Sequence, residues 1–264
     1  MGNIPKFFWG AILMMSGGLT TAWAQSATPA AAAGNVLMQS SEYRFQLDLH
    51  VNDAVLAKML PAGWEPSVAA QGPAKDANLR LILVDCVDIV GPDNKVLGSG
   101  TNRLAMLAAP VKKSGGTDVG QMILGGISES TDVPDAYGVY LKASSSKMSR
   151  TANAANRTVT ETDDWDFAAP GGEHISLHVK FVHKPANRGG GETKFYNPAD
   201  PSQYQNAHTD QMTDIARNVT TNPPDRVLEF SYEAGGGKFS ALLDGSRPLS
   251  WDSQPVYNRT MSAN

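Results

Sequence analysis

Residues 43–51, YRFQLDLHV, alternate strictly between apolar and polar side chains. Successive side chains of a β-strand point to opposite faces, so an alternation of period two predicts a strand with one buried face. The apolar face carries Tyr43, Phe45, Leu47, Leu49 and Val51, and the polar face carries Arg44, Gln46, Asp48 and His50. A strand of this length indicates that the chain builds its core from β-sheet.

A short helix is predicted directly after this strand. Asn52 or Asp53 supplies the N-cap, and an apolar stripe follows as far as Leu60. Pro61 and Gly63 end the helix, because proline cannot continue the hydrogen-bond pattern and glycine favours helix ends.

The remainder of the chain is predicted to be mostly strands. A helix is expected over residues 209–219, which Thr209 can cap, and a hairpin over residues 226–234 and 238–244. No internal repeat or linker divides this part, so we expect a single α+β domain over residues 41–264, mostly antiparallel β with two or three short helices. The other predicted strands cover residues 79–90, 103–110, 120–128, 137–143, 157–162, 173–183 and 192–196.

The N-terminus has the pattern of a secretory signal peptide over residues 1–24. Lys6 supplies the positive charge, an apolar run follows, and Ala22-Trp23-Ala24 forms a small-x-small cleavage site. Residues 25–40, rich in alanine, are expected to be a disordered leader. The predicted location of the protein is therefore periplasmic or secreted.

Composition limits the classes of partner. The formal net charge is −4 and basic residues are scattered, which argues against nucleic-acid binding. After residue 24, no stretch approaches the ~20 apolar residues that a membrane span needs. Cys86 is the only cysteine, so no intrachain disulfide can form, and its apolar neighbours indicate a buried side chain.

The histidines of residues 173–183 raise the question of a metal site. On a strand, His174 and His178 would share a face but stand about 13 Å apart, and His183 would lie on the opposite face. One ion cannot bridge such positions, so we expect no metal and no cofactor. His178, in the middle of the strand, is the best single candidate for a catalytic or ligand-binding histidine.

Lys142 is the most interesting single residue, since it follows Tyr140 on an aromatic strand. In a desolvated pocket its pKa would fall, and the amine could form a Schiff base with a carbonyl substrate. The alternative is an edge lysine whose charged end reaches solvent.

The order of segments resembles the acetoacetate decarboxylase superfamily over roughly residues 41–245. The likeness runs from residues 51–66, VNDAVLAKMLPAGWEP, through the apolar strand ending near Asp85, to residues 133–138, VPDAYG. The resemblance implies a cone-shaped or partly closed β-barrel with an apolar interior pocket. It places Lys142 at or near the Schiff-base lysine and Asp135 at the upstream acid. The chain departs from the family in having Leu141, not proline, before this lysine.

Two functions follow as hypotheses. The first is an exported lyase of decarboxylase type acting on a small keto acid or related carbonyl compound. Lys142 would be the nucleophile, His178 or Glu229 would move protons, and Tyr140 would line the substrate site with Arg80 or Arg103 holding a carboxylate. The second is a non-catalytic periplasmic barrel that binds an apolar small molecule. In both cases the partner is a small molecule, and a homo-oligomer is possible.

Overall fold

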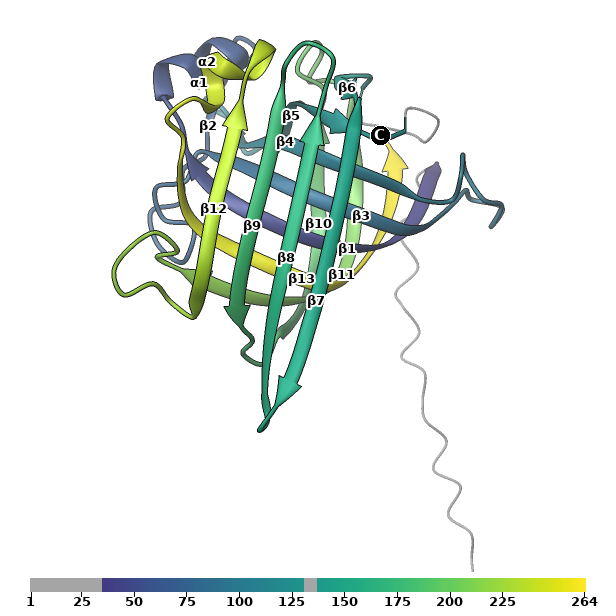
Figure 1. The fold of residues 1–264 in the computed structure, drawn as a ribbon. Coiled ribbons are helices and arrows are strands. Elements are labelled where there is room, and N and C mark those ends of the chain that lie inside the picture. The colour runs from purple at the N-terminus through teal and green to yellow at the C-terminus, as the bar shows by residue number, and fades with distance from the viewer. Residues whose placement is uncertain (1–34, 131–136) are drawn as a thin grey trace, which may run out of the picture. The chain divides into compact units, whose positions relative to one another are not determined.

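The computed structural model describes residues 35–130 and 137–264, all of which lie within a single compact unit. The predicted signal peptide, the leader up to residue 34 and Asp135 lie outside the described residues. The described chain forms two layers of β-sheet whose strands cross steeply (Figure 1). This arrangement agrees with the predicted mostly-β fold.

The first layer is a large sheet that closes on itself. Its order is β2-β4-β3-β1-β13-β11-β10-β5-β6, and a further pairing of β4 with β5 completes a ring. Between β10 and β5 the ring is joined at only two residue pairs, Phe195–Gln121 and Tyr196–Met122, so the barrel is partly closed. The strands are β1 (Val36–His50), β2 (Trp64–Pro66), β3 (Leu79–Val90), β4 (Asn102–Lys113), β5 (Val119–Ser128), β6 (Tyr140–Lys142), β10 (Asn187–Tyr196), β11 (Tyr204–Arg217) and β13 (Arg247–Ala263).

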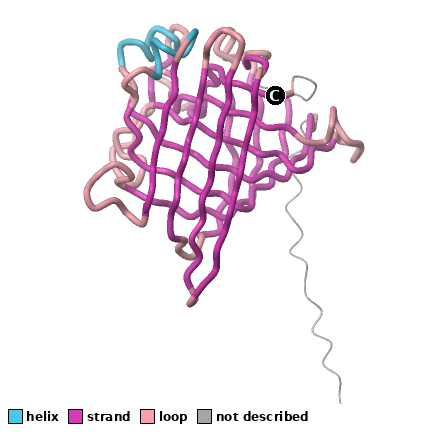
Figure 2. Tube along the Cα trace, in the orientation of Figure 1, coloured by secondary structure: helices cyan, strands magenta, loops and turns pink. Residues whose placement is uncertain are grey.

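The second layer is an antiparallel sheet of order β12-β9-β8-β7 that covers one side of the barrel (Figure 2). Its strands are β7 (Ser145–Ala155), β8 (Thr158–Ala168), β9 (His174–Val182) and β12 (Val227–Gly235). The apolar face of β1 supplies much of the contact, because Phe45 packs against Phe181 and Trp251. The main core therefore lies between the layers, where Leu47, Leu81 and Phe167 are almost completely buried.

Helices are few and short. The helix α1 (Asp53–Met59) begins where it was predicted, because the Asn52 side chain accepts hydrogen bonds from the backbone N–H groups of Ala54 and Val55. A 3₁₀ turn, η1 (Gly237–Phe239), leads into α2 (Ser240–Leu243). Neither described α-helix has the length and apolar character that crossing a membrane requires.

The structure corrects three predictions about individual elements. Residues 209–219 belong mainly to strand β11 rather than to a helix, because β10 and β13 flank the strand and satisfy its backbone groups. Residues 238–244, predicted as a strand, form η1 and α2 instead. Strand β1 starts at Val36, within the leader predicted over residues 25–40, because Val36 pairs with Ser262 of β13.

Candidate functional site

The interior of the barrel is the candidate site, and β1 shows why it is polar. The odd-numbered side chains of β1 face the second sheet, so the even-numbered ones point into the barrel. There Glu42, Arg44 and Asp48 are buried, although each carries a charge in water. Buried charges are costly unless they are paired, so their presence marks a region with a specific role.

Two pockets adjoin inside the barrel and share Arg44 and Phe195. We call the first the apolar pocket, because most of its lining side chains are hydrophobic. They come from β1, β3, β4, β10 and β13. Its apolar lining includes Met38, Val84, Cys86, Leu104, Met106, Phe195 and Met261. The second, the polar pocket, encloses about 860 Å³ including its open mouth. Its polar lining includes Arg44, Gln46, Arg80, Gln121, Gln211, Asp252 and Gln254.

Where the pockets meet, the carboxylate of Glu42 forms ion pairs with two arginines, Arg44 and Arg259. Arg44 Nε lies 2.5 Å from Glu42 Oε2, and Arg259 Nη2 lies 2.8 Å from Glu42 Oε1. Burial alone would raise the pKa of Glu42, but Arg259 and Arg44 outweigh it and lower the pKa to about 2. Within this cluster, two cations face one anion, which leaves an excess positive charge where the pockets meet.

Arg44 also has unused hydrogen-bonding capacity. Its guanidinium stacks on the ring of Tyr257 at 3.6 Å from the ring centroid. The side chain is buried, yet Arg44 Nη2 has no hydrogen-bond partner among the described residues, and the same holds for Arg259 Nε. Buried donors without acceptors are rare in folded proteins, so these atoms point to an acceptor supplied from outside the chain.

A second group of charges lies farther along β1, beside the polar pocket. Arg80 Nε is 3.4 Å from Asp48 Oδ1, and Ser250 Oγ donates to Asp48 Oδ2 at 2.9 Å. Asp252 faces the same pocket but makes no hydrogen bond or ion pair with any residue that the structure describes. Burial, with the nearby charge of Asp48, raises the pKa of Asp252 to about 7.

Of the predicted site residues, Arg80 and Tyr140 line the interior. Arg80 contributes to the polar pocket and Tyr140 to the apolar pocket. Arg103 does not contribute, because it alternates with the interior residues of β4 and pairs with Asp85 at 2.8 Å instead.

Lys142 is exposed, which corrects the prediction of a buried lysine. It lies at the end of the short edge strand β6, and its Nζ donates a hydrogen bond to the backbone carbonyl of Glu129. The desolvation on which a reactive amine was predicted is therefore absent. The edge-lysine alternative describes the side chain better.

His178 and Glu229 come together, but on the solvent-facing side of the second sheet. His178 Nδ1 lies 2.7 Å from Asp164 Oδ1, and His178 Nε2 lies 3.3 Å from Glu229 Oε2. Lys180 also pairs with Glu229 at 2.7 Å. The hydrogen bond to Asp164 is the main cause that raises the pKa of His178. These two predicted residues are thus separated from the barrel interior by the core between the layers.

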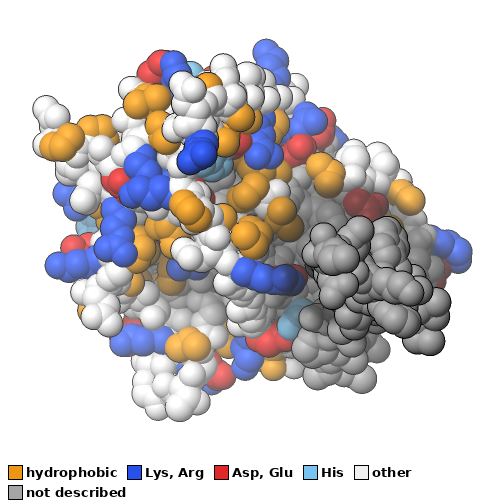
Figure 3. Space-filling model, turned by 90° about the horizontal axis from the view of Figure 1, so that it is seen from below, with side chains coloured by type: hydrophobic (Ala, Val, Ile, Leu, Met, Phe, Trp, Pro, Cys, Tyr) orange, Lys and Arg blue, Asp and Glu red, His pale blue; other side chains and the backbone are white. Residues whose placement is uncertain are grey.

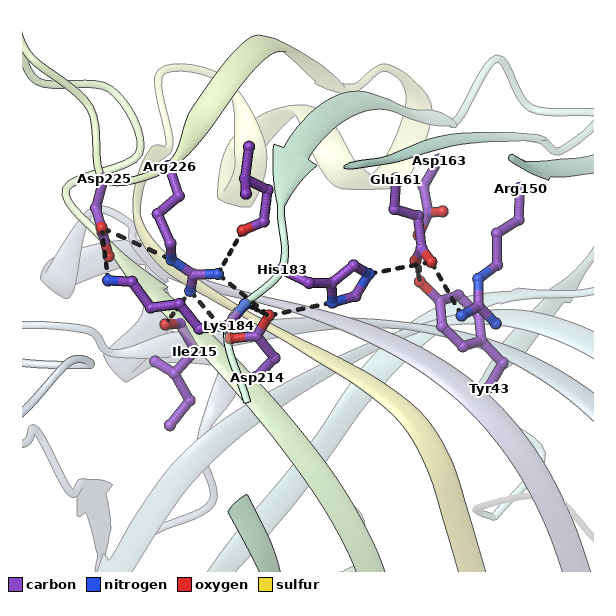
Figure 4. A network of polar contacts seen from close by, with 11 residues as sticks. Tyr43, Arg150, Glu161, Asp163, His183, Lys184, Asp214, Ile215, Asp225 and Arg226 are labelled. Atoms are coloured by element: carbon purple, nitrogen blue, oxygen red, sulfur yellow. Dashed lines mark hydrogen bonds and ion pairs between the residues drawn. The ribbon is translucent and has the colours of Figure 1, made fainter. Parts of the chain in front are cut away.

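A buried polar network joins the two layers (Figure 4). His183 links the sheets, since its Nε2 is 3.2 Å from Glu161 Oε2 and its Nδ1 is 3.2 Å from Asp214 Oδ2. Tyr43 donates to Glu161 at 3.0 Å and also to Asp163. The hydrogen bonds to Asp214 and Glu161 raise the pKa of His183 to about 9.

Two arginines at the ends of this network balance the charge of its carboxylates. Arg150 pairs with Glu161 at 3.0 Å, and Arg226 pairs with Asp214 at 3.1 Å. Burial raises the pKa of Asp163 to about 7, which leaves that carboxyl largely uncharged below neutral pH. Because strands β1, β7, β8 and β11 all contribute, we assign the network to holding the layers together.

Among the described residues, the face of the molecule in Figure 3 shows no large patch of one charge. On the face in Figure 3, the visible Lys and Arg side chains are dispersed among acidic and apolar ones. Within the described part of the chain, no three His, Cys, Asp or Glu side chains are grouped closely enough to hold a metal ion.

The interior residues Glu42, Arg44, Asp252 and Arg259 were not predicted as site residues. Arg44 was placed on the polar face of a strand with one buried face, which is correct for an open sheet but not for a closed one. One signal was available: residues 79–90 are apolar on both faces. A neighbouring strand buried on both sides implies that the polar face of β1 is also enclosed.

Comparison with known proteins supports the fold. No family model matches the sequence, and no curated protein matches it. Among solved structures, the enduracididine biosynthesis enzyme MppR with HEPES buffer bound is similar, with a TM-score of 0.52 and 10% identity, over 89% of this chain and 96% of that one. MppR complexed with the condensation product of pyruvate and imidazole 4-carboxaldehyde gives a TM-score of 0.50 and 10% identity, over 86% of each chain.

An acetoacetate decarboxylase-like enzyme from Sphingomonas wittichii RW1 is also among the similar structures. Its TM-score is 0.49 at 13% identity, over 91% of this chain and 96% of that one. The partly closed β-barrel that the resemblance implies is confirmed by the structure, and MppR shares this fold. At such low identity the likeness extends to the fold alone.

Proposed function

We propose that the barrel interior binds a small organic acid, with its carboxylate on Arg44 and its hydrocarbon part in the apolar pocket. The observation that carries this proposal is the buried Arg44 Nη2, which has no acceptor among the described residues. An unsatisfied buried donor costs about 1–3 kcal/mol, and more when it is charged. A ligand carboxylate would remove that cost and neutralise the excess positive charge left by Glu42, Arg44 and Arg259.

The apolar pocket favours a ligand with a short hydrocarbon chain. Three of its lining residues are methionines, whose flexible side chains adapt to different apolar shapes and offer few hydrogen bonds. Asn102 and Gln205 add amide groups to the lining, which suits a ligand that carries one polar group besides its carboxylate. A 2-keto acid combines these features.

The similar structures support the same chemical class. MppR, which shares the fold, has been solved with a condensation product of pyruvate. In the present chain the proposal does not involve a Schiff base on Lys142, because that side chain is exposed. The signal-peptide pattern of residues 1–24 further leads us to propose that binding takes place outside the cytoplasm.

The test is calorimetric titration with a series of 2-keto acids from 2-oxobutanoate to 2-oxooctanoate, each beside its neutral 2-oxoamide. We expect the acids to bind more tightly as the chain lengthens, and the amides to bind at least about tenfold more weakly. Arg44→Met should abolish the preference for the acid. The matched control is Arg188→Met, since Arg188 is exposed and pairs with Asp210 outside the pockets.

Two outcomes would overturn the proposal. Equal binding of acids and amides would favour the purely apolar ligand, and no binding of either would remove the carboxylate site altogether. Should Arg44→Met fold poorly, Met106→Trp fills the apolar pocket from strand β4 and leaves Arg44 and Arg259 unchanged. That variant should bind the long-chain acids more weakly while its affinity for 2-oxobutanoate changes little.

A further inference from the structure

The polar pocket is lined by side chains whose hydrogen-bonding groups the protein does not use. Gln121 and Gln254 are buried against the pocket, yet neither side chain makes a hydrogen bond with any described residue. Gln121 Oε1 in particular is buried without a donor in the described chain. Asp252, on the same strand as Gln254, also has no hydrogen bond or ion pair within residues 35–130 and 137–264. Because most buried polar side-chain atoms in folded proteins have a partner, this group points to partners from outside the chain.

The pairing of strands brings these side chains to one pocket. Asp252 and Gln254 are two positions apart on β13, so they share a face and lie about 7 Å apart along it. Gln46 of β1 lies opposite Asp252. Its Nε2 donates to Asp48 Oδ1 at 3.2 Å, which leaves the amide oxygen of Gln46 for the pocket. Gln121 reaches the same pocket from β5. One small molecule that carries several polar groups can therefore contact this set.

The chemistry of the lining favours hydroxyl groups. A glutamine amide offers two N–H donors and one carbonyl acceptor, and an ionised carboxylate offers acceptors only. A hydroxyl both donates and accepts, so hydroxyl groups can satisfy the free amides of Gln121 and Gln254 and also donate to Asp252. An ammonium group only donates and a carboxylate only accepts, so either would leave part of each amide unpaired.

The charged groups that line the pocket away from Arg44 also favour a neutral ligand. Arg80 Nε lies 3.4 Å from Asp48 Oδ1. Glu192 Oε1 lies 2.6 Å from His208 Nδ1. Within the described part of the chain, an anionic ligand would therefore find no free cation on this side of the pocket.

The pocket has room for a small ring and opens at the gap in the barrel. It encloses about 860 Å³ including its mouth, within the range of about 300–1,000 Å³ typical of small-molecule sites. The exposed residues Gly190 and Gly191 line it on β10, ahead of the residues that join β10 to β5. A Cβ added at Gly191 would meet nothing within 4 Å, so the entrance is unobstructed there. Ile82 and Phe195 add apolar surface to the lining, which suits the C–H face of a ring.

We propose that the polar pocket binds a neutral monosaccharide whose hydroxyl groups contact Asp252, Gln121 and Gln254. A charge-assisted hydrogen bond from one hydroxyl to Asp252 supplies the strongest single contact, and the two amides fix the orientation of the ring. This site is separate from the proposed carboxylate site, because none of these three side chains lines the apolar pocket. Binding of a sugar and binding of an organic acid can therefore be tested independently.

The test is calorimetric titration of the full chain at pH 7 with D-glucose, D-galactose and D-mannose, each beside its 2-amino sugar, and with cyclohexanol. We expect at least one hexose to bind saturably, about tenfold or more tighter than cyclohexanol and no more weakly than its amino sugar. Asp252→Ala and Gln254→Leu should each weaken that binding by about tenfold or more, because each removes hydrogen bonds to the sugar. Asp166→Asn, which changes an exposed carboxylate on the second sheet, should bind the hexose like the unchanged protein.

Three results would overturn the sugar site. They are the absence of binding by all three hexoses, binding that neither variant weakens, and tighter binding of an amino sugar than of its hexose, which would indicate a cationic ligand. Neither variant removes a hydrogen bond or ion pair present within the described chain, so both should fold. Thermal unfolding followed by circular dichroism checks this, and if one variant is unfolded the other decides. Failure of the 2-keto acids to bind would overturn the proposed function and leave the sugar site standing.

Discussion

Replacing His183 by glutamine should make the stability of the protein less dependent on pH. In the folded chain the pKa of His183 is raised from 6.5 to about 9, chiefly by Asp214 and then by Glu161. A histidine whose pKa is raised on folding contributes stability fully below pH 6.5, and the contribution is lost as the pH rises through about 9. The charged imidazole therefore stabilises the junction between the layers at neutral pH.

The size of the effect follows from the same values. One pKa unit corresponds to about 1.4 kcal/mol, so a rise from 6.5 to about 9 gives about 3.4 kcal/mol as an upper limit. The side chain is 20% exposed, and solvent screening reduces the expected contribution to about 2 kcal/mol. We expect His183→Gln to lose about this much at pH 6 and much less at pH 10.

Urea unfolding followed by circular dichroism at pH 6, 8 and 10 measures this difference. Taking the difference between variant and unchanged protein cancels the titration of groups present in both. His208→Gln is the control, because His208 contacts one exposed carboxylate, Glu192, and should change the free energy of unfolding by less than about 0.5 kcal/mol. A loss for His183→Gln that stays constant from pH 6 to 10 would refute the reasoning.

Three further predictions concern packing, closure and the exposed lysine. Leu81→Ala, at a fully buried position, should lower the free energy of unfolding by about 2–5 kcal/mol in urea, whereas Leu228→Ala at 57% exposure should leave it nearly unchanged. Gly120→Ala should lower the midpoint of thermal unfolding, because the added Cβ would lie 2.4 Å from a backbone carbonyl oxygen of β10. Gly116→Ala is the control, since its Cβ would meet nothing closer than 3.6 Å. Equal midpoints for the two variants would contradict the close approach of β5 to β10. Lys142→Met should bind 2-oxobutanoate with unchanged affinity in calorimetry, and a large loss would show that the exposed amine takes part after all.

The sequence predicts those parts of the fold in which local pattern and environment agree. The alternation around Phe45 identifies β1, and Asn52 identifies the start of α1. The pattern fails for residues 209–219, where the spacing of Met212, Ile215 and Ala216 suits one face of a helix. The segment is a strand because β10 and β13 pair with it on either side. A bulge between Met212 and Asp214 in the pairing with β13 changes which side chains face inward.

The candidate site is harder to predict because it depends on closure. Arg44 and Asp252 are far apart in sequence, and only the pairing of the first strand with the last brings them onto one wall. Charged residues at alternating positions look the same in sequence whether they face water or a barrel interior. Arg80 and Tyr140 were identified, whereas Lys142 was misplaced, because β6 is a short strand at the edge of the sheet.

The pairing of Val36 with Ser262 makes the two ends of the described chain neighbours. During synthesis, β1 emerges long before β13, which is its partner along most of its length. Contacts between residues so distant in sequence make folding slow. Until β13 pairs with β1, the edge of β1 stays exposed, and chaperones bind unpaired strand edges of this kind.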